Sequence, residues 1–123
     1  ALRGRTVGQF DPVISFTREI THAGSRRALL GENPGEELVS AFSNELQVTA
    51  ETPPAILVHS GDDSGVPVEN SIVYYRALQE KEIPSSLHIY PYGGHGYSLA
   101  IGRGHLSTWP DRVIEWIRYL YKE

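Results

Sequence analysis

Residues 53–61 read Pro-Pro-Ala-Ile-Leu-Val-His-Ser-Gly, and this stretch decides the fold class of the chain. A run of four apolar side chains between a proline pair and a glycine is typical of a short buried strand. We therefore expect a strand over residues 55–59, and the rest of the fold is worked out from this strand.

A helix and a second strand follow. Apolar side chains recur at helical spacing after the strand, which predicts an amphipathic helix over residues 68–81. The apolar positions of this helix are Val68, Ile72, Tyr75 and Leu78. Pro84 ends the turn behind the helix, and residues 86–90 predict the second strand.

A last helix is expected from Thr108 to the C-terminus. Thr108 and Asp111 have the spacing of a capping box, and one apolar stripe follows them. The stripe consists of Val113, Ile114, Ile117, Leu120 and Tyr121. The order strand, helix, strand, helix indicates an α/β unit with a parallel sheet and right-handed crossover connections.

The first part of the chain carries weaker signals. Residues 1–12 are rich in glycine and arginine and show no apolar period, so we expect a poorly specified arm. Residues 13–16 fit a short strand or the end of one, residues 17–35 predict an irregular connection, and residues 36–42 predict a short helix. The predicted fold is therefore a short parallel sheet of about three strands with flanking helices.

Composition excludes several classes of protein. The 123 residues suffice for one domain with a core, and a net charge of −4 without a basic stripe makes nucleic acid a poor candidate partner. Cysteine is absent, which excludes a disulfide framework, a thiolate zinc site and a cysteine nucleophile. No apolar run approaches the roughly 20 residues of a membrane span, and no cofactor motif or targeting segment is visible. The chain opens at Ala1 without a methionine, so we expect it to be cut from something longer, and its localisation stays open.

The residues with catalytic potential follow the two predicted strands. Asp62 and Asp63 come directly after the first strand, and His95 lies in a Gly-Gly-His-Gly loop after the second. The carboxyl ends of parallel strands meet at one edge of a sheet, so we expect an aspartate and this histidine to lie close together. A carboxylate that orients an imidazole is one half of a Ser-His-Asp relay.

Residues 51–116 resemble the C-terminal part of α/β-hydrolase-fold esterases, most closely the acetyl-xylan esterase-like, xylanase-associated group. Dienelactone hydrolases and prolyl oligopeptidases are more distantly similar. The motifs that carry the resemblance are Thr52-Pro53-Pro54, Gly61-Asp62-Asp63, Val66-Pro67-Val68-Glu69-Asn70-Ser71 and Tyr90 followed by Gly93-Gly94-His95-Gly96, together with Thr21-His22, Gly24-Ser25-Arg26, Leu30-Gly31 and Ser43–Thr49 upstream. The resemblance implies that residues 13–123 are the C-terminal half of an α/β-hydrolase domain.

The resemblance also implies an activity and its residues. It makes His95 the histidine of the triad and places the acid in the Asp62-Asp63 pair, with Asp62 preferred and Asp63 as the alternative. The implied reaction is hydrolysis of a small-molecule carboxylic ester, with an acyl or a carbohydrate ester as substrate and no cofactor.

The chain departs from this pattern at the nucleophile. A hydrolase of this class needs a serine in a G-x-S-x-G elbow and backbone donors for the oxyanion. The nearest approach is Ser98, which lies three residues beyond His95 on a glycine-rich loop and not between a strand and a helix. We therefore expect the nucleophile and the first half of the sheet to be missing and the chain alone to be inactive.

Other interpretations of the same residues stay open. The aspartates are compatible with simple turn formers, and His95 with an ordinary loop histidine. A metal site of Asp62, Asp63, His95 and His105 has no spacing typical of zinc or calcium. A non-catalytic binding module of half-hydrolase shape is the main alternative function, and a flavodoxin-like domain lacks its phosphate loop.

Half a sheet leaves one edge open. Unpaired backbone groups and exposed apolar side chains at such an edge favour association with another chain. We therefore expect a homodimer formed by edge pairing or segment exchange.

Overall fold

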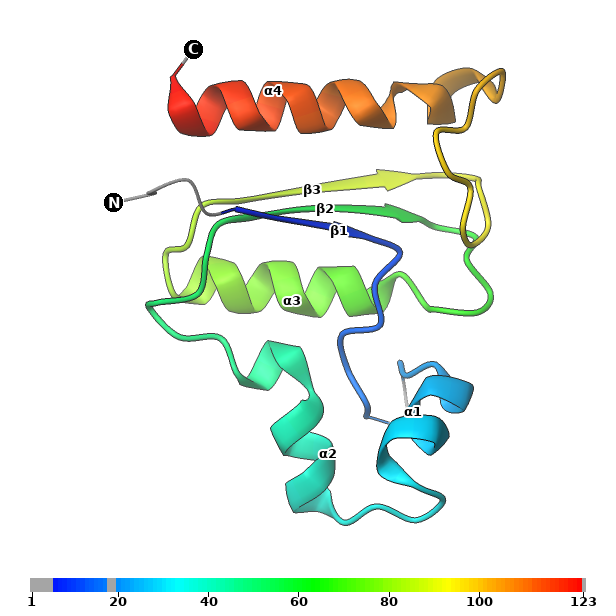
Figure 1. The fold of residues 1–123 in the computed structure, drawn as a ribbon, viewed down its shortest axis with the longest axis vertical. Helices are drawn as coiled ribbons and strands as arrows, with labels where there is room; N and C mark the ends of the chain where they lie inside the picture. The colour runs from blue at the N-terminus through cyan, green and yellow to red at the C-terminus, as the bar shows by residue number, and fades with distance from the viewer. Residues whose placement is uncertain (1–5, 18–19, 123) are drawn as a thin grey trace.

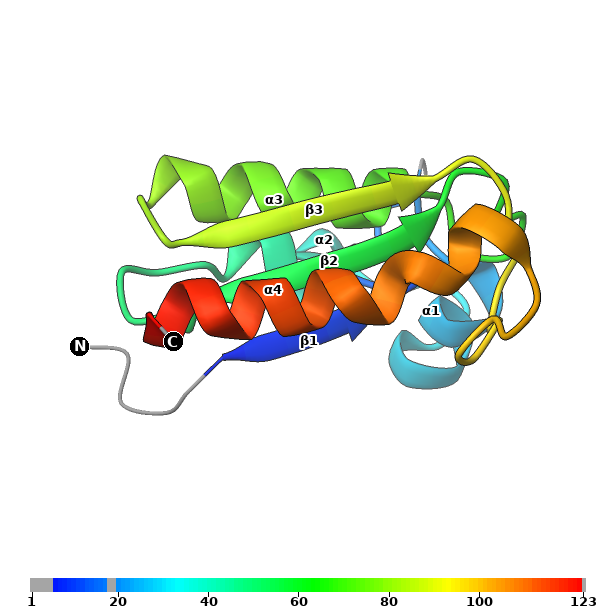
Figure 2. The ribbon, with the colours of Figure 1, turned by 90° about the horizontal axis from the view of Figure 1, so that it is seen from above.

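The structure is a computed structural model that describes residues 6–17 and 20–122. Its centre is a parallel sheet of three strands in the order β1–β2–β3, namely β1 (Val7–Phe10), β2 (Ala55–Ser60) and β3 (Ser85–Tyr90). All three strands therefore end at the same edge of the sheet, where their following loops meet (Figure 2).

Helices cover both faces of this sheet (Figure 1). The helices are α1 (Ala23–Leu30), α2 (Glu36–Phe42), α3 (Glu69–Glu80) and α4 (Trp109–Tyr121), with short 3-10 turns η1 (Asn44–Leu46) and η2 (Gly104–Thr108). Helix α3 lies against one face, with α1 and α2 beyond it, and α4 covers the opposite face. A parallel sheet with both faces covered is buried on both sides, which explains the unbroken apolar run of β2.

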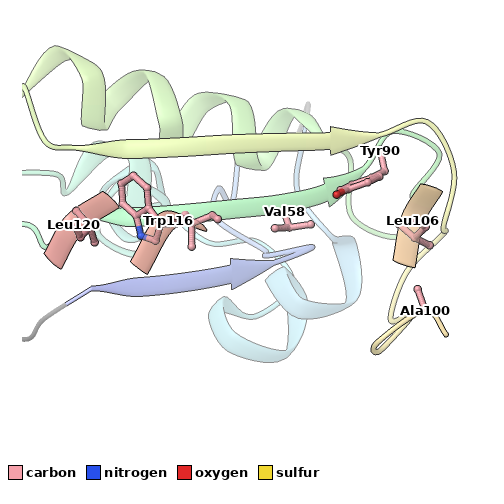
Figure 3. Close-up of a cluster of buried hydrophobic side chains, with 7 residues drawn as sticks. Val58, Tyr90, Ala100, Leu106, Trp116 and Leu120 are labelled. Carbon is pink, nitrogen blue, oxygen red and sulfur yellow. The ribbon is translucent and has the colours of Figure 1, made fainter. Parts of the chain in front are cut away.

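The side chains of β2 divide the core into two halves. Ile56 and Val58 point toward α4, where they pack with Tyr90, Ala100, Leu106, Trp116 and Leu120 (Figure 3). Ala55 and Leu57 point toward α3, where Leu78 and Ile83 complete a second cluster. All six residues of β2 are buried, so this strand is the centre of the molecule.

The predicted fold class is confirmed in the second half of the chain. The first predicted strand extends to Ser60, the helix expected over residues 68–81 is α3, and the strand expected over residues 86–90 is β3. The short helix predicted over residues 36–42 is α2. Among the described residues no helix is long and apolar enough to cross a membrane.

The N-terminal part differs from the expectation. A strand forms at residues 7–10, within the stretch expected to be an arm, while residues 1–5 of that stretch lie outside the described residues. Residues 13–16 are not a strand, because the N–H groups of Ile14 and Ser15 donate to the side chain of Asn70 at 3.0 Å and not to a neighbouring strand. Helix α1 forms inside the segment expected to be irregular.

The predicted capping box at the start of α4 is wrong. Helix α4 continues from η2, so Thr108 has helical backbone angles, φ −85° and ψ −5°, and makes no side-chain cap. Its hydroxyl donates to the carbonyl of His105 at 2.8 Å and contacts the Tyr90 hydroxyl at 3.0 Å. A capping side chain needs an extended backbone at this position, which the preceding turn prevents.

Candidate active site

Two loops meet at the carboxyl edge of the sheet. The acid loop, residues 61–68, follows β2, and the histidine loop, residues 91–103, follows β3. Since β2 and β3 are hydrogen-bonded neighbours, their following loops begin side by side.

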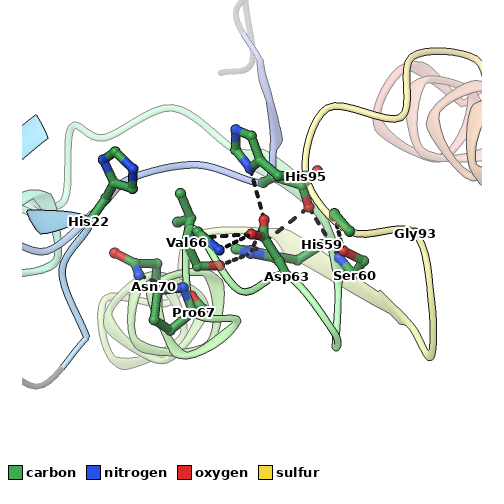
Figure 4. Close-up of polar contacts among 12 residues, drawn as sticks. His22, His59, Ser60, Asp63, Val66, Pro67, Asn70, Gly93 and His95 are labelled. Carbon is green, nitrogen blue, oxygen red and sulfur yellow. Dashed lines mark hydrogen bonds and ion pairs between the residues drawn. The ribbon is translucent and has the colours of Figure 1, made fainter. Parts of the chain in front are cut away.

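Asp63 of the acid loop and His95 of the histidine loop form a hydrogen-bonded pair (Figure 4). Nδ1 of His95 lies 2.8 Å from Oδ2 of Asp63, whose side chain is fully buried, while the His95 side chain is 54% exposed. When Nδ1–H donates to the carboxylate, the other ring nitrogen of the neutral imidazole carries a free lone pair. The buried partner therefore orients an accessible base.

The main chain of the acid loop holds Asp63 in place. Oδ1 of Asp63 accepts from the N–H groups of Gly65 at 3.0 Å and Val66 at 2.8 Å. Burial acts to raise the pKa of Asp63, but the N–H of Val66, the His95 side chain and the N–H of Gly65 outweigh it and hold this pKa below its ordinary value. Asp63 is therefore an anion wherever His95 works as a base.

Asp62 has a different partner from the one expected for it. Its Oδ1 accepts from the main-chain N–H of Gly94 at 2.8 Å, so the exposed carboxylate joins the acid loop to the histidine loop. The carboxylate that bonds to His95 belongs to Asp63, the alternative acid. The N–H groups of residues 65 and 66 donate to this carboxylate and hold it in the interior of the loop.

Glycine is required where the histidine loop passes the end of β2. Gly93 has φ +146°, and a Cβ there would lie 3.0 Å from the Leu106 side chain and 3.2 Å from Cβ of Ser60. A larger residue would therefore push this loop, and His95 with it, away from the acid loop.

Two further groups lie beneath the pair, and sequence reasoning missed one of them. Asp11, directly after β1, accepts from the Ser60 N–H at 3.1 Å, and its carboxylate lies 3.9 Å from Nε2 of the buried His59. The same ring nitrogen lies 3.5 Å from Asp63. Burial raises the pKa of Asp11 above its ordinary value. The sequence gives no signal for Asp11, because residues 1–12 show no apolar period; only the strand at residues 7–10 places Asp11 at this edge.

Asp11, His59 and Asp63 are close enough to be considered as metal ligands, with their donor atoms within 4.8 Å of one another. Nε2 of His59 is 2.8 Å from the carbonyl of Val66, which only accepts, so this nitrogen carries the proton. Nδ1 of His59 is 2.7 Å from the Ser71 hydroxyl. Both nitrogens are thus engaged, which fits a structural histidine, and His88 likewise bonds to Ser86 at 2.7 Å.

Two alternative roles find no support in the arrangement of side chains. In the described residues, the ring of His105 packs against Tyr90 with centroids 5.0 Å apart, and it does not join the cluster of candidate metal ligands. The carbonyl of Ser98 accepts from the Trp109 indole at 2.9 Å. Within the described part of the chain, no hydrogen bond joins the Ser98 hydroxyl to His95.

A large cavity lies elsewhere in the molecule. It measures about 650 Å³ and is situated at the start of β3, between this strand and α4, with Pro84, His88 and Arg112 in its lining. None of its lining residues belongs to the acid loop or the histidine loop. The Asp63–His95 pair therefore lies outside this cavity.

The fold and this pair together define an α/β hydrolase, in which a buried carboxylate orients a histidine at the carboxyl edge of a parallel sheet. Residues 7–122 match the prolyl oligopeptidase family, and the chain belongs to this family.

Individual relatives agree with this assignment. The solved acetyl ester-xyloside bifunctional hydrolase of Caldicellulosiruptor lactoaceticus superposes with a TM-score of 0.89 at 41% identity, over 94% of this chain and 42% of that one. The acetylxylan esterase of Xylanibacter ruminicola is 37% identical over 86% of this chain and 22% of its own length. Endo-1,4-beta-xylanase B of Butyrivibrio fibrisolvens is 47% identical over 72% of this chain and 14% of its own length.

These matches confirm the resemblance to the C-terminal part of an α/β-hydrolase-fold esterase of the acetyl-xylan esterase and xylanase-associated group. The chain spans less than half the length of each of these relatives.

Proposed function

We propose that this chain supplies the acid and the histidine of a serine esterase that removes acetyl groups from sugars. The observation that carries the proposal is the 2.8 Å hydrogen bond between buried Asp63 and half-exposed His95. The substrate is inferred from the relatives, two of which are named for acetylxylan or for acetyl ester and xyloside hydrolysis.

In the proposed mechanism His95 works first as a base and then as an acid. The free ring nitrogen of His95 accepts the proton of a serine hydroxyl as its oxygen bonds to the ester carbonyl carbon. The imidazolium, stabilised by Asp63, then donates that proton to the leaving sugar oxygen as the C–O bond breaks. Water then loses a proton to His95 as its oxygen bonds to the acetyl carbon, and His95 returns that proton to the serine oxygen as acetate leaves.

The serine is proposed to lie outside this chain. No serine of the sequence has glycine two residues before and two residues after it. A site completed by further residues explains this absence, and the partial coverage of the relatives is consistent with it.

The proposal is tested with a hybrid protein in which residues 7–122 replace the matching part of the Caldicellulosiruptor lactoaceticus hydrolase. We expect the hybrid to hydrolyse nitrophenyl acetate and acetylated xylo-oligosaccharides, and this chain alone to hydrolyse neither. His95→Ala and Asp63→Asn in the hybrid should lower kcat by about 10³-fold or more, as expected for residues of a relay.

Asp62→Asn is the matched control, since it changes the neighbouring carboxylate, which bonds to a main-chain N–H and not to His95. We expect a loss of kcat below about 10-fold for this variant. A folded hybrid that has no activity would favour the non-catalytic module, and activity that persists in His95→Ala would contradict the proposed role of this residue.

A further inference from the structure

His22 caps helix α1 in an unusual way. Its ring nitrogen Nδ1 accepts from the main-chain N–H of Ser25 at 3.0 Å and lies 2.8 Å from the Ser25 hydroxyl. The N-cap position of a helix is ordinarily occupied by serine, threonine, aspartate or asparagine. Each of these smaller side chains can make the same bond. Capping alone therefore does not explain a histidine here.

The residues that follow His22 hold its ring in one orientation. A Cβ at position 24 would lie 3.2 Å from Cε1 of the ring, so Gly24 leaves the space that the ring occupies. Because Nδ1 accepts from a main-chain N–H, the proton of the neutral ring is on Nε2. The motif His22-x-Gly24-Ser25 thus presents one fixed N–H donor, and no described residue accepts from it.

A set of hydrogen bonds ties this donor to the acid loop. The side-chain amide of Asn70 donates to the carbonyl of Ile20 at 2.5 Å and to that of Pro67 at 3.0 Å. Ile20 is two residues before His22, and Pro67 follows Val66, whose N–H binds Asp63. In Figure 4 the rings of His22 and His95 both lie on the side of Val66 that faces away from α3.

We propose that His22 is a substrate-binding residue that donates its Nε2–H to an oxygen of the alcohol portion of the ester. This inference rests on the proposed function. In that mechanism His95 protonates the leaving alcohol, so the alcohol portion of the substrate lies beside His95. A fixed donor on the same rim contacts that portion, which favours alcohols with a second oxygen, such as the neighbouring hydroxyl of a sugar, over simple alkyl or aryl alcohols.

The test compares two substrates in the hybrid protein. His22→Asn and His22→Ser keep a side-chain oxygen that caps α1 but remove the ring donor. We expect each to raise KM for an acetylated xylo-oligosaccharide by about 3- to 10-fold, the loss of one hydrogen bond, with little change in kcat. KM for nitrophenyl acetate, which has no second oxygen on its alcohol portion that fits the donor, should stay the same, and so should the unfolding midpoint.

Each outcome of this experiment decides between the proposals. An equal rise of KM for both substrates, or no rise for either, would overturn the role of His22 and leave the esterase activity intact. A hybrid without activity would overturn the proposed function and this inference together. The chain alone gives an independent check, because ¹⁵N NMR should find His22 as the Nε2–H tautomer, and an Nδ1–H ring would contradict the proposal.

Discussion

The fold shifts the pKa values of two neighbouring buried carboxyl groups, Asp63 and Asp11, in opposite directions. The pKa of Asp63 lies below its ordinary value, because main-chain N–H groups and His95 outweigh its burial. The pKa of Asp11 is raised, because burial outweighs its bond from Ser60 and the nearby His59. One carboxylate therefore stabilises the fold when it is charged, and the other destabilises it.

This contrast predicts opposite effects of two matched substitutions on stability. At pH 7, Asp63→Asn should lower the free energy of unfolding, and Asp11→Asn should raise it, since asparagine still accepts from the Ser60 N–H. The effect of Asp11→Asn should vanish below the ordinary aspartate pKa of 3.8, where this carboxyl group is protonated in the folded and the unfolded chain. The effect of Asp63→Asn should begin to shrink as the pH falls toward 3.8 and should vanish only below the lowered pKa of Asp63 in the folded chain. Urea unfolding between pH 3 and pH 7 measures this, and a pH-independent effect of either variant would contradict it.

The sequence alone could not decide between Asp62 and Asp63. Both aspartates follow the same strand, and which one turns inward depends on where the N–H groups of Gly65 and Val66 point. That direction is set by the path of the acid loop, and no pattern of residue types encodes it. The pairing of strand ends, by contrast, follows from the order of elements, so the position of His95 beside an aspartate could be predicted.

At the scale of the elements, Asn70 connects α3 to the long segment after β1. Its buried side chain accepts from the N–H groups of Ile14 and Ser15 and donates to the carbonyls of Ile20 and Pro67. The side chain of Asn70 thereby accepts the hydrogen bonds that the backbone of a neighbouring strand would otherwise accept. A strand over residues 13–16 was a reasonable expectation from their apolar character, and this side chain is the reason that none forms.

Asn70→Ala should therefore destabilise the chain by about 3 kcal/mol, because it leaves two buried N–H groups and a carbonyl without partners. Urea unfolding followed by circular dichroism measures this change. Gln79→Ala is the control on the same helix, since the Gln79 side chain is exposed and, among the described residues, bonds to the Ser85 hydroxyl alone. Its effect should stay within about 0.5 kcal/mol. Equal effects of the two variants on the free energy of unfolding would show that the buried hydrogen bonds of Asn70 do not stabilise the chain.

Apart from α2, which buries no residue, the predicted elements are those whose apolar pattern matches the period of a helix or strand. Strand β2 is buried on both faces, and helices α3 and α4 each bury one face, so apolar residues recur in their sequences at the matching period. Strand β1 contains Gly8 and Gln9, and helix α1 buries only Leu30, so neither has enough buried positions to produce a period. Both are held by tertiary contacts, β1 by its pairing with β2.

At the scale of the whole molecule, the outer edge of β1 pairs with no strand among the described residues. The N–H of Val7 donates to the carbonyl of Pro54, just before β2, and the N–H of Asp11 donates to the carbonyl of Val58 in β2. Because backbone groups alternate in direction along a strand, the N–H groups of Gly8 and Phe10 point away from β2. Phe10 is 46% exposed. This edge combines free backbone groups with apolar surface, which is the usual mark of a pairing site.

Helix α4 extends the apolar surface above this edge. Arg112, Glu115 and Tyr119 line the cavity on the β3 side of the helix. By helical periodicity, the exposed Ile114 and Ile117 lie on the other side, above β1. In an esterase completed by a serine-bearing part, we propose that this edge and helix face contact that part, and that in the isolated chain they contact a second copy.

The isolated chain should therefore form a two-fold dimer through β1, and Phe10→Pro should weaken it. Proline removes an outward N–H without touching the bonds from β1 to β2, and it is tolerated at the edge of a sheet. Sedimentation velocity over a hundredfold range of concentration should find a dimer for the native chain and a shift toward monomer for this variant. Ile101→Lys, which replaces a side chain 84% exposed in the histidine loop, is the control and should leave the dimer unchanged. A native chain that stays monomeric throughout would contradict the proposed dimer. A dimer that survives Phe10→Pro would place the contact elsewhere, because only an interface at β1 depends on that backbone group.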